Sequence, residues 1–141
     1  MDKLNISRIF LGGLVAGLII NIGEMLLNIV FLDGQWEAAM EAIDVPMADS
    51  VGMMIWFFAS GFIFGIAGVA LYAAFKPTCG AGPKTAICAG LTVWFLTYFM
   101  GYAGIFFAGV FPMSLFWWSE IWGIVEITLG VLAGAALYKD R

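Results

Sequence analysis

The sequence predicts an all-α integral membrane protein in which four transmembrane helices form a compact bundle. Of its 141 residues, 63% are hydrophobic and 11% are charged, whereas about 25% of the residues in a soluble domain are charged. The apolar residues also form four runs, each able to cross about 30 Å of hydrocarbon as a helix. These runs occupy residues 8–32, 51–75, 85–110 and 115–138. They leave little chain for a soluble catalytic domain, so we expect no enzyme activity.

The positive charges predict how the chain crosses the membrane. The basic residues are Lys3, Arg8, Lys76, Lys84, Lys139 and Arg141. They lie at the two termini and between the second and third runs, which a four-span chain places on one side. The positive-inside rule therefore puts both termini in the cytoplasm.

The outer connection, residues 33–50, is predicted to contain a short amphipathic helix on the outer membrane surface. Trp36, Met40 and Ile43 fall on one helical face, and the helix should end before Pro46. The carboxylates of this connection are Asp33, Glu37, Glu41, Asp44 and Asp49. They either gather cations or bind a basic partner, or they form a solvated acidic loop.

Short sequence similarities between the two halves favour a tandem repeat of two helical hairpins. Residues 16–18 recur as 89–91, and the end of the second run, residues 68–72, resembles residues 134–138. Such a repeat would be parallel. The alternative is that small residues, Tyr and Lys are simply common in membrane helices and at their ends.

Small residues at helical spacing predict close helix packing, because backbones approach each other in lipid only where side chains are small. The predicted packing positions are Gly13, Gly17, Gly61, Gly65, Gly101, Gly130 and Gly134.

Two glutamates, Glu24 and Glu126, lie deep inside predicted spans. An ionisable group in hydrocarbon costs several kcal/mol, so it is kept where it is paired, neutralised or used. Each glutamate lies on a helix face that is small toward the cytoplasm and polar further out. On the first span the face is Gly13, Gly17, Asn21, Glu24 and Asn28; on the fourth it is Ser119, Gly123, Glu126, Gly130 and Gly134. The two spans run antiparallel, so these faces have the polarity needed to meet.

Carboxylates that meet at this depth would share a proton, since two like charges cannot both ionise cheaply there. With oxygen ligands around them they could instead bind a hard cation or an organic cation. The candidate site is Glu24, Glu126, Asn21, Asn28, Glu120 and Ser119, with Thr97, Tyr98 or Tyr102 as further neighbours. The alternative is a protonated glutamate acting only as interhelical glue, worth about 0.6–1.7 kcal/mol.

Several chemistries are excluded by what the sequence lacks. It contains no histidine, and the spacing of Cys79 and Cys88 matches no metal motif. We therefore expect no cofactor and no metal centre of the His or Cys type. Acidic net charge and burial in lipid exclude nucleic-acid binding.

The stretch from Leu71 to Trp94 resembles a group of uncharacterised small bacterial four-span membrane proteins. The resemblance rests on Leu71, Tyr72, Pro77, Gly80, Gly82, Pro83, Lys84, Thr85, Ala86, Ala89, Gly90, Leu91 and Trp94. It implies the four-span fold and the bacterial inner membrane, and no activity. Glu24 is also similar in position to the glutamate of small multidrug resistance transporters, but this chain is longer and lacks their surrounding motif.

The leading hypothesis is a non-enzymatic transport or binding protein with an intramembrane carboxylate site for a proton or cation. The alternative is a structural or accessory subunit of a larger membrane complex, and an enzyme acting on lipid ranks third. The expected partners are the lipid bilayer and a second copy or another membrane subunit.

Overall fold

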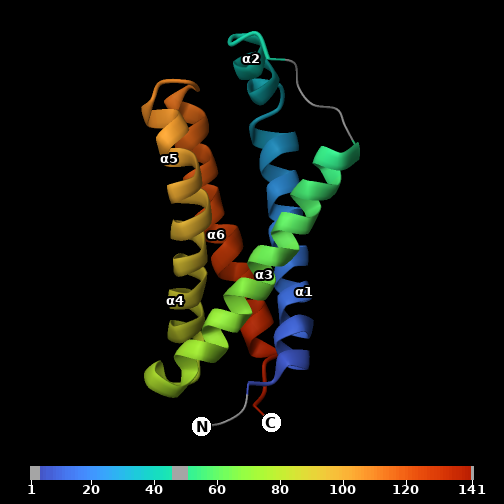
Figure 1. Ribbon diagram of the computed structural model, residues 1–141, viewed down its shortest axis with the longest axis vertical. Coiled ribbons are helices and arrows are strands. Elements are labelled where there is room, and N and C mark those ends of the chain that lie inside the picture. The colour runs from blue at the N-terminus through green and yellow to red at the C-terminus, as the bar shows by residue number, and fades with distance from the viewer. Residues whose placement is uncertain (1–3, 46–50, 141) are drawn as a thin grey trace.

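The four predicted spans are helices in the computed structural model, which describes residues 4–45 and 51–140 (Figure 1). The first span is α1 (Ile6–Leu26), continued by the π-helix η1 (Leu27–Phe31), and the second is α3 (Val51–Cys79). The third is α4 (Pro83–Trp94), the π-helix η2 (Phe95–Phe99) and α5 (Met100–Phe107); the fourth is α6 (Met113–Ala136). The prediction of a compact four-helix bundle of membrane-spanning length is confirmed.

Glycines set the two closest helix contacts. A Cβ placed on Gly65 of α3 would lie 2.3 Å from the backbone nitrogen of Gly17 and 2.4 Å from the carbonyl oxygen of Gly13, both on α1. On the other side of α1, a Cβ on Gly134 of α6 would lie 2.5 Å from the carbonyl oxygen of Gly12. Backbones that touch at these points leave no room for any side chain, so α1 packs directly on both α3 and α6.

Most predicted packing glycines lie in such contacts, but Gly101 does not. The six in close contact are Gly13, Gly17, Gly61, Gly65, Gly130 and Gly134. A Cβ on Gly101 would have no other described atom within 4 Å, and Gly101 is exposed on α5. The prediction is wrong there because the face of α5 that bears Gly101 points away from the bundle.

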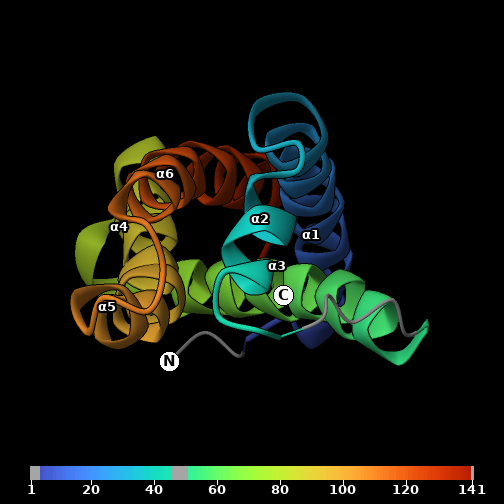
Figure 2. The ribbon, with the colours of Figure 1, turned by 90° about the horizontal axis from the view of Figure 1, so that it is seen from above.

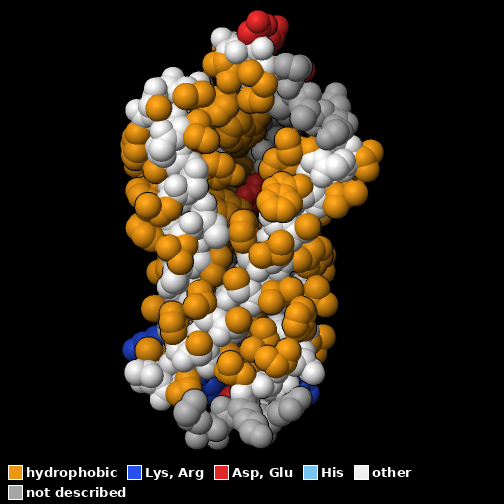
Figure 3. Space-filling model, viewed as in Figure 1, with side chains coloured by type: hydrophobic (Ala, Val, Ile, Leu, Met, Phe, Trp, Pro, Cys, Tyr) orange, Lys and Arg blue, Asp and Glu red, His pale blue; other side chains and the backbone are white. Residues whose placement is uncertain are grey.

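The helix α3 crosses the bundle obliquely, so that its first half stands away from the other helices (Figures 1 and 2). Every residue from 51 to 58 is exposed, so the described chain covers the start of α3 only sparsely before Phe58, whose carbonyl accepts a hydrogen bond from Asn21 of α1. In the space-filling view a hollow opens between α5 and this half of α3 (Figure 3). We call it the lateral hollow.

The connection after η1 contains the short helix α2 (Gln35–Glu41), as predicted. Its apolar side packs on the end of the bundle: the Trp36 ring meets the rings of Phe106 and Phe111 at centroid distances of 6.2 and 5.8 Å. This corrects the prediction of a helix whose apolar face meets lipid. Ile43 follows the helix and is exposed, and Asp49 lies outside the described residues.

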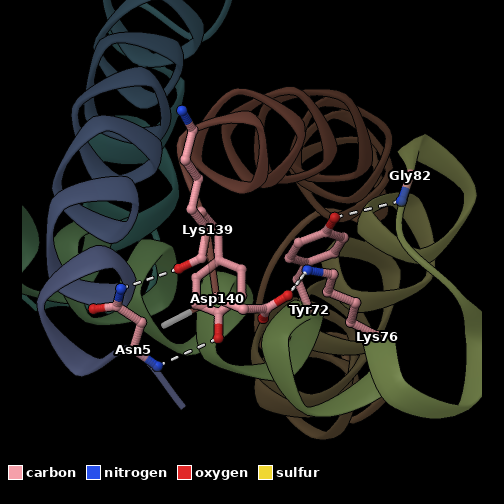
Figure 4. Close-up of polar contacts among 7 residues, drawn as sticks. Asn5, Tyr72, Lys76, Gly82, Lys139 and Asp140 are labelled. Carbon is pink, nitrogen blue, oxygen red and sulfur yellow. Dashed lines mark hydrogen bonds and ion pairs between the residues drawn. The ribbon is translucent and has the colours of Figure 1, made fainter. Parts of the chain in front are cut away.

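Polar contacts hold the opposite end of the bundle, where both termini lie (Figures 1 and 4). Lys76 of α3 forms an ion pair with Asp140 and lies 5.6 Å from the centre of the Tyr138 ring. The side chain of Asn5 donates to the carbonyl of Lys139 at 3.1 Å. These contacts join the start of α1, the end of α3 and the segment after α6.

Candidate functional site

Glu24 and Glu126 meet at the hydroxyl of Tyr98. The phenol oxygen lies 2.7 Å from Oε1 of Glu126 and is also hydrogen-bonded to Oε1 of Glu24. The three side chains come from α1, η2 and α6, so three of the four spans contribute to one polar cluster. We call Glu24, Tyr98 and Glu126 the triad. The triad thus includes Glu24 and Glu126 from the candidate site, and Tyr98, which the sequence named only as one of three further neighbours.

Asn28 completes the surroundings of Glu24. Its side-chain amide donates to Oε2 of Glu24 at 3.0 Å and to the backbone carbonyl of the same residue at 2.8 Å. Both carboxylate oxygens of Glu24 therefore have partners. Glu24 is half-buried and Asn28 is exposed, so this side of the triad lies near the protein surface.

Glu126 is the enclosed member of the triad, with 4% of its surface exposed. Its Oε2 is buried and has no hydrogen-bond partner among the described residues. The oxygen lies against α1, where a Cβ on Gly23 would be 2.3 Å away from it. The indole of Trp122 donates to the carbonyl of Gly23 at 2.9 Å and so holds α1 and α6 together at this height.

Tyr98 fits beside α6 because a glycine faces it. A Cβ on Gly123 would lie 2.6 Å from Cδ1 of the Tyr98 ring. The other ring contacts are with Phe64 of α3 and Tyr102 of α5, at centroid distances of 6.2 and 6.0 Å. The ring is thus packed on three sides, which fixes its hydroxyl between the two carboxylates.

Both π-helices lie at the triad. Tyr98 belongs to η2, Asn28 belongs to η1, and Glu24 lies three residues before η1. π-helical turns are rare, and they occur frequently at functional sites. A π-turn changes the direction of the side chains that follow it, which a regular helical repeat does not anticipate.

The other predicted site residues lie outside the triad. Asn21 is buried between α1 and α3, where its amide donates to the carbonyl of Phe58 at 3.1 Å. The predicted face of α1 therefore divides: Gly13, Gly17 and Asn21 contact α3, whereas Glu24 and Asn28 reach the triad. The expectation that this whole face meets α6 is wrong, because α3 crosses α1 on the glycine side. Thr97 bonds to the carbonyl of Val93 in its own helix.

Glu120 and Ser119 are buried on α6 without hydrogen bonds to the triad among the described residues. Glu120 is 2% exposed, and neither of its carboxylate oxygens has a described hydrogen-bond partner. The indole of Trp94 donates to its backbone carbonyl at 3.1 Å. Glu120 is therefore a separate buried acid near the triad.

Acidic side-chain atoms are visible at the floor of the lateral hollow (Figure 3). The described acids within the spans are Glu24, Glu120 and Glu126. Of these three glutamates, Glu120 and Glu126 are almost wholly buried, and Glu24 is half-buried. Within the described residues no group of three or more His, Cys, Asp or Glu side chains is arranged to hold a metal ion.

Comparison with protein-family models, with curated proteins and with solved structures found no match.

Proposed function

We propose that this chain is a non-enzymatic transport or binding protein of the bacterial inner membrane whose triad takes up a proton or a small cation. The observation that carries the proposal is the meeting of two carboxylates at one tyrosine hydroxyl inside the spans. A pure packing role needs one polar pair between two helices. Three ionisable side chains from three spans, of which Glu24 is only half-buried, form instead a site that can exchange a charge with its surroundings.

The orientation belongs to the same proposal. The start of α1, the end of α3, the start of α4 and the segment after α6 lie at one end of the bundle (Figure 1). These parts contain the described basic residues Arg8, Lys76, Lys84 and Lys139. With the positive-inside rule this end is cytoplasmic, and α2 and its carboxylates face the outside.

Replacing Glu24 or Glu126 singly with glutamine tests the proposal. Glutamine keeps the shape of the side chain and removes its titration. We expect each variant to lose proton or cation flux in proteoliposomes at least about tenfold, since positioned groups accelerate proton transfer by about 10²–10⁴-fold. The cation- and pH-dependent shift in thermal stability should fall with it.

The matched control is Glu37→Gln, which makes the same chemical change on the exposed face of α2. It should leave the flux and the thermal shift unchanged. The proposal would be contradicted if both triad variants kept the wild-type flux and the wild-type thermal shift.

One observation favours a second candidate, an accessory subunit of a larger membrane complex. Residues 51–58 of α3 are exposed on all faces, and a helix from a partner subunit could cover the side that the bundle leaves free. Under this alternative both glutamine variants retain assembly, and a stoichiometric partner copurifies after mild detergent extraction.

A further inference from the structure

The triad needs one more proton than the tyrosine supplies. A phenol has a single hydrogen to donate and can accept hydrogen bonds at its oxygen. The Tyr98 oxygen is within hydrogen-bond distance of two carboxylate oxygens. If the phenol donates to one carboxylate, the second contact holds only when the other carboxyl is protonated and donates to the phenol oxygen. Two bare oxygens at 2.7 Å would otherwise repel each other in a medium of low dielectric.

The two carboxyl groups differ in access. Glu24 is half-buried and is held by the exposed Asn28. Glu126 is 4% exposed, and its second oxygen faces Gly23 without a described hydrogen-bond partner. The hydrogen bond to Tyr98 is therefore a direct polar connection between Glu126 and the side of the triad that reaches the surface.

We infer that Tyr98 is a proton relay through which the enclosed Glu126 is loaded and unloaded by way of Glu24. This inference rests on the proposed function and assigns the proton as the species that the triad handles. A metal ion fits less well, because no described acidic cluster is arranged to hold one and hard cations take six or more oxygen ligands.

In the unloading step the carboxyl proton of Glu126 moves to the phenol oxygen while the phenol proton moves to Oε1 of Glu24. The O–H bonds of Glu126 and Tyr98 break, and new O–H bonds form on Tyr98 and Glu24. The tyrosine is regenerated, and one proton has passed from Glu126 to Glu24. Loading is the same step in reverse, and no other reactant is needed.

The groups around the relay are consistent with a site that works through acids alone. From α6 the ionisable neighbours are Glu126 and Glu120, and α5 supplies Tyr102, whose ring packs against the Tyr98 ring at a centroid distance of 6.0 Å. From α3 the triad meets the ring of Phe64. The described lysine of α3, Lys76, is at the opposite end of the bundle, paired with Asp140.

The test is the rate at which Glu126 changes protonation after a rapid pH jump, followed by infrared absorption of the protonated carboxyl in detergent-solubilised protein. The band is assigned by its absence in Glu126→Gln. Tyr98→Phe removes the hydroxyl and keeps the ring. We expect it to slow the Glu126 band at least about tenfold and to leave the Glu24 band fast. In the wild type, Glu126 should also change protonation more slowly in D₂O than in H₂O, because the relay moves two protons.

Tyr102→Phe is the matched control, because it removes the hydroxyl of the ring packed beside Tyr98 and should leave the Glu126 rate unchanged. Equal rates in wild type and Tyr98→Phe, or equal slowing in both tyrosine variants, overturn the relay. If Tyr98→Phe does not fold, Glu24→Gln serves instead: the relay predicts slow exchange at Glu126, and a wild-type rate overturns it. Because the assay follows protonation and not flux, the relay can hold even where the proteoliposome experiment finds no transport.

Discussion

Replacing Gly65 with alanine should weaken the α1–α3 contact more than any other single methyl group added to α3. The new Cβ would lie 2.3 Å from the backbone nitrogen of Gly17 and 2.4 Å from the carbonyl oxygen of Gly13. Backbone atoms cannot rotate aside as a flexible side chain does, so the helices must separate. Overpacking of this kind costs about 1–3 kcal/mol, and in lipid no hydrophobic driving force between the helices offsets the lost contact.

Gly101→Ala is the matched control on α5. The same methyl group enters open space there, and alanine is the better helix former by about 0.5–1 kcal/mol. The two substitutions should therefore have opposite signs: reversible unfolding in mixed micelles should show Gly65→Ala destabilised and Gly101→Ala unchanged or stabilised. Equal stability of the two variants would contradict the close α1–α3 crossing.

Hydropathy predicted the spans because a helix in lipid must satisfy its backbone internally and cover it with apolar side chains. That constraint acts on every residue of a span, so the boundaries follow from the sequence alone. It contains no information about which helices touch. The glycine at position 101 resembles the glycine at position 65 in the sequence, yet Gly65 lies against the backbone of α1 and Gly101 lies against no described atom of another helix.

The glutamates could be predicted as a pair because intramembrane acids are costly and because both lie on helix faces of matching polarity. Two other features depended on how the helices cross and turn in the folded structure. Because α3 crosses α1 obliquely, the side chain of Asn21 donates a hydrogen bond to the carbonyl of Phe58. The face of α1 that looks continuous in the sequence is therefore divided between α3 and the triad. The π-turn of η2 sets the direction of Tyr98, so a count based on 3.6 residues per turn could not choose between Thr97, Tyr98 and Tyr102.

Gly23→Ala should remove the function of the triad without changing any of its members. A Cβ on Gly23 would lie 2.3 Å from Oε2 of Glu126 and 2.9 Å from its Cβ. The short distance to Cβ means that a rotation of the carboxyl group alone cannot relieve the clash. The Glu126 side chain must move as a whole, and its hydrogen bond to Tyr98 breaks. We expect proton or cation flux to fall as far as in Glu126→Gln.

A double variant separates this local effect from general damage to the helix contact. In Gly23→Ala combined with Glu126→Ala, residue 126 has no atoms beyond its Cβ. The carboxyl group that would clash with the new methyl group at position 23 is therefore absent. The loss of stability should then be smaller than the sum of the two single losses, since residues in contact couple by about 0.5–3 kcal/mol. Flux should stay absent, because the carboxyl has been removed. Additive losses would mean that Gly23 does not face Glu126, and full flux in Gly23→Ala would mean that the triad can work without the hydrogen bond between Tyr98 and Glu126.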